Sequence, residues 1–246
     1  MQKDYQYVKY VLDPHINMTA KDYMNSRGKA GVGADTIFKW MQLGIEYAGI
    51  DMAEYEKPGR TYIFLHTSAV RTLSSGKVNG GFFFDYPIVV KDSSANPIKS
   101  KLDSTADSTR PAVSWNEYPQ QMVKNYFLYL IVEGVHGFDN LTIPNQSLTT
   151  AMPAGSVVSP TDSKLGWVVT KTTPNPDFTA TTLIIFDPTA GTGFDPEGKI
   201  NLKLGNNDTS PIVVNDRTND RSAGYIATNG QLHVFATTVH PFRYSF

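Results

Sequence analysis

From Thr61 to the end of the chain, short segments rich in β-branched and aromatic residues alternate with Pro, Gly, Asn and Asp. Apolar segments bounded by turn-forming residues are typical of β-strands. The dipeptide Asn229-Gly230 separates two of them and is the strongest hairpin signal in the chain. With one similar segment near the N-terminus, the pattern predicts strands at residues 5–13, 61–66, 80–90, 125–133, 165–171, 180–187, 199–204, 211–215, 223–228, 231–239 and 241–246.

The connections between these strands differ widely in length, and no internal repeat of fixed period occurs. Both features disfavour a propeller, a solenoid or a uniform up-and-down barrel. We therefore expect a mainly β protein, with a jelly-roll-like or Greek-key antiparallel β-sandwich. The length of 246 residues fits one such domain spanning residues 1–246, although it also fits two small domains.

The N-terminal region of about 14–60 is predicted to contain loops and one short helix, at about 35–50. Asp35 is a favourable N-cap residue. The apolar residues that follow are three or four positions apart, as on one face of a helix: Ile37, Trp40, Met41, Gly44, Ile45 and Ala48. Such a helix either packs on the sheet or contacts a neighbouring subunit. Residues 17–34 are polar and Gly-rich, which indicates a loop.

A long polar stretch covers residues 91–112, and with its flank it is predicted to be a loop over 91–115. Loops of this length within a domain are uncommon and are often functional or interfacial, although this one could also be a domain boundary. Residues 116–124 are predicted to form a short helix or turn.

Composition excludes several classes of function. The chain has no cysteine, so disulfides, thiolate nucleophiles and cysteine-ligated metals are excluded. Its 22 Lys and Arg residues against 23 Asp and Glu give a net charge of −1, so direct binding of nucleic acid is not expected. The N-terminal residues lack the apolar core of a signal peptide. No apolar run approaches the roughly 18 residues that a transmembrane helix needs.

Residues 186–199 hold the candidate metal ligands, Asp187, Asp195 and Glu197, in a glycine-rich turn. Carboxylate oxygens on a turn are the ligands that calcium prefers, although the spacing is not that of an EF-hand. Two interpretations therefore stand, a calcium site and carboxylates that cap turns. The same two apply to the polar residues Asn215, Asp216, Asn219 and Asp220.

Other residue clusters give weaker signals of chemistry. The five histidines, His15, His66, His136, His233 and His240, lack metal-binding spacing. Glu133, His136 and Asp139 follow a predicted strand and form the most enzyme-like group, although the glycines among them indicate a plain turn. Residues 27–35 do not match a phosphate-binding loop, and no nucleophile-elbow motif occurs. The aromatic residues Trp115, Tyr118 and Tyr126 either stack on sugars or fill the core or an interface.

These observations favour a structural subunit that assembles with copies of itself, and with other coat proteins, into a virion coat. Such a protein would be made in the host cytoplasm, would reside in the virion and would not be an enzyme. The expected β architecture resembles that of coat proteins only by analogy. The first alternative is a carbohydrate-binding adhesin, lectin or spike module. The second is an enzyme whose site is assembled from distant loops.

Overall fold

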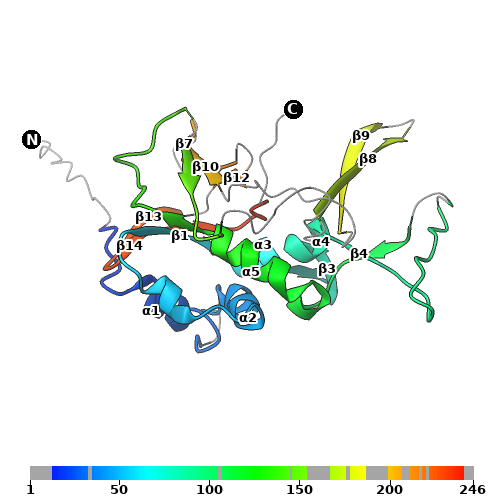
Figure 1. Ribbon diagram of the computed structural model, residues 1–246, viewed down its shortest axis with the longest axis horizontal. Coiled ribbons are helices and arrows are strands. Elements are labelled where there is room, and N and C mark those ends of the chain that lie inside the picture. Colours follow the sequence, from blue (N-terminus) through cyan, green and yellow to red (C-terminus); the bar gives the residue numbers. More distant parts are fainter. Residues whose placement is uncertain are drawn as a thin grey trace, which may run out of the picture.

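The computed structural model describes residues 13–32, 35–102, 104, 107–144, 146–153, 167–175, 178–186, 199–206, 211–215, 218–219 and 222–240. Within these residues, the strands form three four-stranded sheets and one two-stranded sheet, accompanied by short helices, so the protein is mainly β (Figure 1). No helix in the described part of the chain is both long enough and apolar enough to cross a bilayer.

The central sheet has the strand order β13-β14-β1-β6. Its strands are β13 (Ser222–Ala227), β14 (Gly230–Phe235), β1 (Arg60–Leu65) and β6 (Ile131–Glu133). The β13–β14 pair is the hairpin that the sequence predicts, with Ala227 opposite Gly230. However, β14 runs parallel to β1, so the expectation of a purely antiparallel arrangement is wrong for this sheet. A Cβ on Gly230 would lie 2.0 Å from the Arg60 carbonyl oxygen, so glycine permits this close pairing.

A second sheet shares one segment of chain with the first. Its order is β12-β11-β10-β7. The strands are β12 (Thr218–Asn219), β11 (Ile212–Val214), β10 (Lys199–Leu204) and β7 (Gln146–Thr149), and β10 and β11 confirm two predicted strands. Directly after β7, Thr150 bridges to Val132 of the central sheet, and the Ala151 N–H donates to the Ile131 carbonyl at 2.8 Å. Residues 146–151 thus pass from one sheet to the other, as at a sandwich corner.

The N-terminal helices are α1 (Ala20–Ser26) and α2 (Lys39–Tyr47), and α2 confirms the predicted helix over part of its range. In Figure 1 they lie on the opposite side of the central sheet from β7 and β10. Two expectations here are wrong. Residues 17–34 are not all loop, because the Thr19 hydroxyl accepts from the Asp22 N–H at 3.1 Å and caps α1. Asp35 does not cap α2 but pairs with Arg27 at 2.9 Å.

The predicted strand at 125–133 is wrong for most of its length. Residues Gln120–Tyr129 form helix α5, and only β6 is extended. Pro119, whose fixed φ suits a helix start, precedes α5. From Tyr126 to Tyr129 helix α5 is aromatic or aliphatic at every position, and periodicity cannot distinguish such a run from a buried strand.

The predicted strand at 80–90 is also wrong in its first half. Residues Phe82–Asp85 form helix α4, and the strand is reduced to β4 (Ile88–Val89). Phe82 and Phe83 are both fully buried, and their rings contact Trp115 and Tyr118. Adjacent residues of a strand point to opposite faces, so burying both rings in one aromatic cluster favours the helix over the strand propensity of Phe.

Two extensions leave the body at the same end of the molecule. The remaining four-stranded sheet has the order β5-β4-β9-β8 and contains β5 (Thr109–Arg110), β9 (Phe178–Phe186) and β8 (Trp167–Asn175). The β8–β9 hairpin confirms two predicted strands in the described range and stands away from the body, as does the chain between β4 and β5 (Figure 1). The other elements are α3 (Thr67–Val70), β2 (Thr72–Ser74), β3 (Lys77–Gly80), and the 3-10 helices η1 (Met52–Tyr55) and η2 (Trp115–Glu117). The predicted strand at 241–246 and residues 5–12 lie outside the described residues.

Candidate functional site

The predicted calcium ligands Asp187, Asp195 and Glu197 lie outside the described residues. Within the residues that are described, no group of three His, Cys, Asp or Glu side chains is arranged to hold a metal ion. Asn215, from the second polar segment, is buried, and its amide donates to the Tyr129 hydroxyl and the His240 carbonyl, each at 2.9 Å. This residue therefore links the core to the chain after β14.

The most enzyme-like cluster of the sequence is not assembled as a catalytic group. The His136 ring bonds the backbone carbonyl of Glu133 at 2.9 Å, not its carboxylate. The His136 N–H donates to the Thr61 hydroxyl at 2.8 Å, and Asp139 is exposed at the turn. These contacts support the interpretation of this segment as a structural turn, while the Glu133 side chain lines a pocket described below.

His233 is a fully buried histidine in β14. Its Nδ1 accepts from the Gly224 N–H at 3.0 Å, and its Nε2 bonds the His136 carbonyl at 2.8 Å. This pair of contacts requires the neutral ring with hydrogen on Nε2. Loss of hydration on burial lowers the pKa of His233 to about 4. His233 therefore acts as a neutral structural link between β13 and the turn after β6.

The candidate sugar-stacking residues belong to the core. Trp115, Tyr118 and Tyr126 are only 3%, 2% and 1% exposed. Each polar atom reaches a backbone carbonyl: Trp115 Nε1 donates to Trp40 at 2.8 Å, and the hydroxyls of Tyr118 and Tyr126 donate at 2.7 and 2.8 Å. The interpretation of these aromatics as core residues is confirmed, and none of the three offers a face to a sugar.

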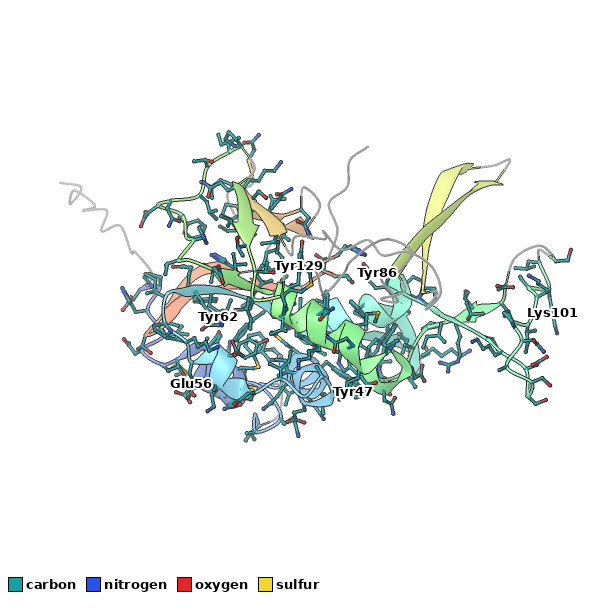
Figure 2. All side chains as sticks on the ribbon, viewed as in Figure 1. Tyr47, Glu56, Tyr62, Tyr86, Lys101 and Tyr129 are labelled. Carbon is teal, nitrogen blue, oxygen red and sulfur yellow. The ribbon has the colours of Figure 1, made fainter. Side chains whose placement is uncertain are left out.

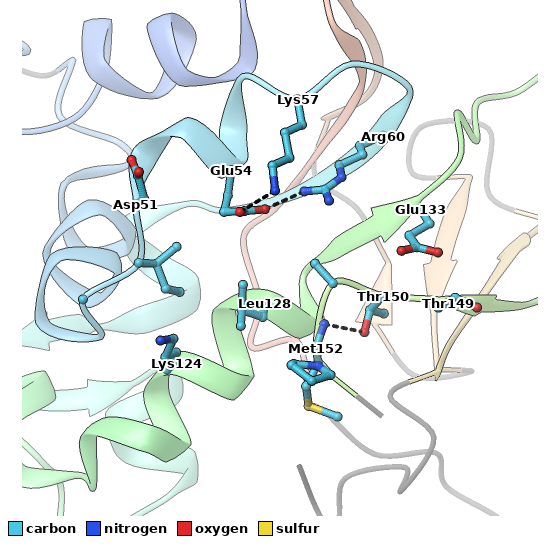
Figure 3. Close-up of a pocket in the computed structure, with 14 residues that line it drawn as sticks. Asp51, Glu54, Lys57, Arg60, Lys124, Leu128, Glu133, Thr149, Thr150 and Met152 are labelled. Atoms are coloured by element: carbon cyan, nitrogen blue, oxygen red, sulfur yellow. Dashed lines mark hydrogen bonds and ion pairs between the residues drawn. The ribbon is translucent and has the colours of Figure 1, made fainter. Parts of the chain in front are cut away.

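A pocket of about 630 Å³ opens beside the edge of the central sheet (Figure 3). One wall is formed by the turn after α2, helix η1 and the start of β1, and the opposite wall by α5, β6 and residues 149–153. Lys124 and Leu128, one helical turn apart on α5, both line it. The pocket thus combines three stretches of chain that are distant in sequence.

The charges of one wall are paired with one another. The Glu54 carboxylate accepts from Lys57 at 2.6 Å and from Arg60 at 2.8 Å (Figure 3). These contacts, with the Lys57 hydrogen bond the largest, lower the pKa of Glu54 from its ordinary value. Asp51 accepts from the Ala53 N–H at 2.9 Å and caps η1. This wall is therefore preorganised, with its charged groups held in place.

The opposite wall carries two charged groups without such pairing. Neither Lys124 nor Glu133 forms an ion pair or a side-chain hydrogen bond among the described residues. Glu133 lies opposite Arg60 in the β1–β6 register, although the Arg60 guanidinium is directed to Glu54. The sequence interpretation singled out Glu133 for a different reason and missed Lys124, because no local motif connects residues from such distant segments.

A projecting arm between β4 and β5, described at residues 91–102, 104 and 107, is the second prominent feature. Lys101 lies at its far end, well away from the core residue Tyr86 (Figure 2). Near this end Leu102 is 100% exposed, and Ile98 is 43% exposed. The arm is held by its own pairing: the Ile98 N–H donates to the Val90 carbonyl at 2.9 Å, and Lys99 pairs with Asp107 at 2.7 Å. It therefore presents apolar side chains on an organised extension.

No protein-family model matches the sequence, and no curated protein matches it either.

Proposed function

We propose that the protein is a structural subunit that assembles with copies of itself, as in the coat of a virion. The observation that carries the proposal is the arm between β4 and β5, which projects from the body and exposes Leu102 completely. A fully exposed leucine near the end of a projecting arm gains free energy when a neighbouring molecule covers it, by about 1.5–3 kcal/mol for complete burial. Projecting arms of this kind suit lateral contacts between subunits.

The β8–β9 hairpin supports the same proposal. Its strands have nine residues each, and its pairing to the rest of the described chain is the single register position Ile88–Phe186 with β4. A hairpin with so little support is marginally stable alone in water, and an exposed strand edge is a template for pairing with another chain. A neighbouring subunit would supply the missing contacts.

A jelly-roll or Greek-key sandwich is part of the proposal. The segment 146–151, which pairs with both sheets, is the kind of corner that joins the two layers of a sandwich. Because the net charge is −1, the proposed coat encloses its genome without direct contact between this chain and nucleic acid. Its partners are then copies of itself and other coat proteins, and its location is the virion.

The test is the particle mass of the purified protein in neutral buffer, measured by light scattering with negative-stain microscopy of the same sample. We expect closed shells or one stable ring-like oligomer. A 27.2 kDa monomer that persists at high concentration would overturn the proposal.

A charged substitution at the end of the arm then tests its role. Leu102→Glu should shift the protein toward monomer, because a carboxylate at the interface must be desolvated. Val32→Glu is the matched control, because Val32 is also strongly exposed, at 86%, but lies between α1 and α2. Equal assembly of both variants and the unsubstituted protein would exclude the arm as the contact.

A further inference from the structure

The pocket beside α5 has the size and construction of a small-molecule site. Its volume of about 630 Å³ lies within the roughly 300–1,000 Å³ typical of such sites. Its charged wall around Glu54 is already fixed by Lys57 and Arg60, so a ligand does not need to order that wall. Preorganisation of this kind lowers the entropic cost of binding.

The two charged groups of the wall formed by α5 and β6 have opposite signs, whereas the Asp51 carboxylate of the other wall is held by the Ala53 N–H. In Figure 3 Lys124 and Glu133 lie at opposite ends of the wall formed by α5 and β6, with Leu128 between them. Among the described residues, neither Lys124 nor Glu133 has an ion-pair partner. A ligand can therefore meet an ammonium group at one end and a carboxylate at the other.

Apolar side chains and threonine hydroxyls both line the pocket beside these two charges, the latter from Thr149 and Thr150. Leu128 lies one helical turn from Lys124, and the nearly buried side chains of Ile50 and Met152, which are 8% and 3% exposed, also line the pocket. Apolar ligand atoms can therefore pack against Leu128, Ile50 and Met152.

We infer that this pocket binds a small zwitterion whose ammonium and carboxylate groups are separated by a short apolar segment, such as an ω-amino acid or a short peptide. The ligand carboxylate meets Lys124, and the ligand ammonium meets Glu133. A ligand with only one charge would pair with only one of Lys124 and Glu133 and would lose one charge-assisted contact, so the pocket discriminates against it. The inference does not depend on assembly of the protein.

The test uses three probes of equal length: 6-aminohexanoate, hexanoate and hexylammonium. Binding to the full chain is followed by two-dimensional NMR or by calorimetry. We expect 6-aminohexanoate to bind about tenfold more tightly than either singly charged probe, because it alone can form a charge-assisted hydrogen bond at each end of the pocket. Equal binding of the three probes, or no binding of 6-aminohexanoate at millimolar concentration, would overturn the inference.

Substitutions separate the two ends of the pocket. Lys124→Met should lower the affinity for 6-aminohexanoate about tenfold and leave the affinity for hexylammonium unchanged. Glu133→Gln should also lower the affinity for 6-aminohexanoate about tenfold, but should leave the affinity for hexanoate unchanged. Lys39→Met is the matched control, because Lys39 is exposed at the start of α2 and does not line the pocket. Circular dichroism establishes that each variant is folded before its affinity is compared.

A charge exchange provides the strictest test of the pairing. Lys124→Glu alone places a carboxylate at both ends and should abolish binding of 6-aminohexanoate. The double variant Lys124→Glu with Glu133→Lys should restore it, because this probe can bind in the reversed direction. Failure of the double variant to bind, although it is folded, would contradict the assignment of the two ends.

Discussion

Acidification should destabilise the protein through His233, well before its carboxylates are protonated. In the unfolded chain this histidine binds a proton below pH 6.5, whereas in the folded protein, where it is fully buried, its pKa is about 4. Between these values the unfolded state binds more protons, so the free energy of unfolding falls as the pH is lowered. Since each pKa unit corresponds to about 1.4 kcal/mol, the loss from pH 7 to pH 4 is about 3 kcal/mol.

Urea denaturation at half-unit steps from pH 7.5 to pH 4.5 would measure this dependence. His233→Gln keeps one donor and one acceptor but removes the titration, so its free energy of unfolding should vary much less over this range. Val32→Ala, at an exposed position that does not titrate, serves as control and should keep the slope of the unsubstituted protein. The pKa values of Glu54 and Asp13 are lowered, so the stability they contribute is lost only below about pH 4.5. An unchanged slope in His233→Gln would refute the reasoning.

Two further substitutions test the packing of the body. Gly44→Ala would place a Cβ 2.4 Å from a ring carbon of Phe127 and 2.8 Å from one of Trp115. We expect overpacking to lower the free energy of unfolding by about 1–3 kcal/mol, which outweighs the gain of about 1 kcal/mol in helix propensity. The double variant with Phe127→Leu should recover part of this loss. Urea denaturation measures both effects. Asn229→Ala removes hydrogen bonds at 2.9 Å to the backbone of α1 and of η1 and should cost about 1–3 kcal/mol in thermal unfolding, whereas Thr228→Ala, at the exposed neighbouring position, should cost far less.

The strands that the sequence predicted correctly are those whose own residues favour a strand. Residues 61–66 and 199–204 are rich in β-branched, aromatic and aliphatic residues, and both ranges become strands, β1 and β10. The dipeptide Asn229-Gly230 correctly marked the hairpin. Its side-chain role was not foreseeable, because the amide of Asn229 bonds residues 20 and 55, which are remote in sequence.

The helices that the sequence missed are those whose surroundings override local preference. The last four residues of α5 and the first three of α4 are aromatic or aliphatic without interruption, and such runs are also typical of a buried strand. The decisive contacts come from distant segments, since Gly44 lets α2 approach the rings of Phe127 and Trp115 closely. A single sequence does not reveal which distant helix will pack against such a glycine.

The position of the pocket follows from the way the chain changes sheets. Helix α5 ends one residue before β6 begins, so Lys124 and Leu128 are followed within a few residues by Glu133. The chain then returns through β7 and leaves the second sheet at Thr150 to pair again with β6. The same corner that joins the sheets therefore brings residues 149–153 against α5 and forms one wall of the pocket. Because Lys124 belongs to α5 and Glu133 to the end of β6, the two side chains are held on separate elements, which is the condition for selecting a ligand with two separated charges.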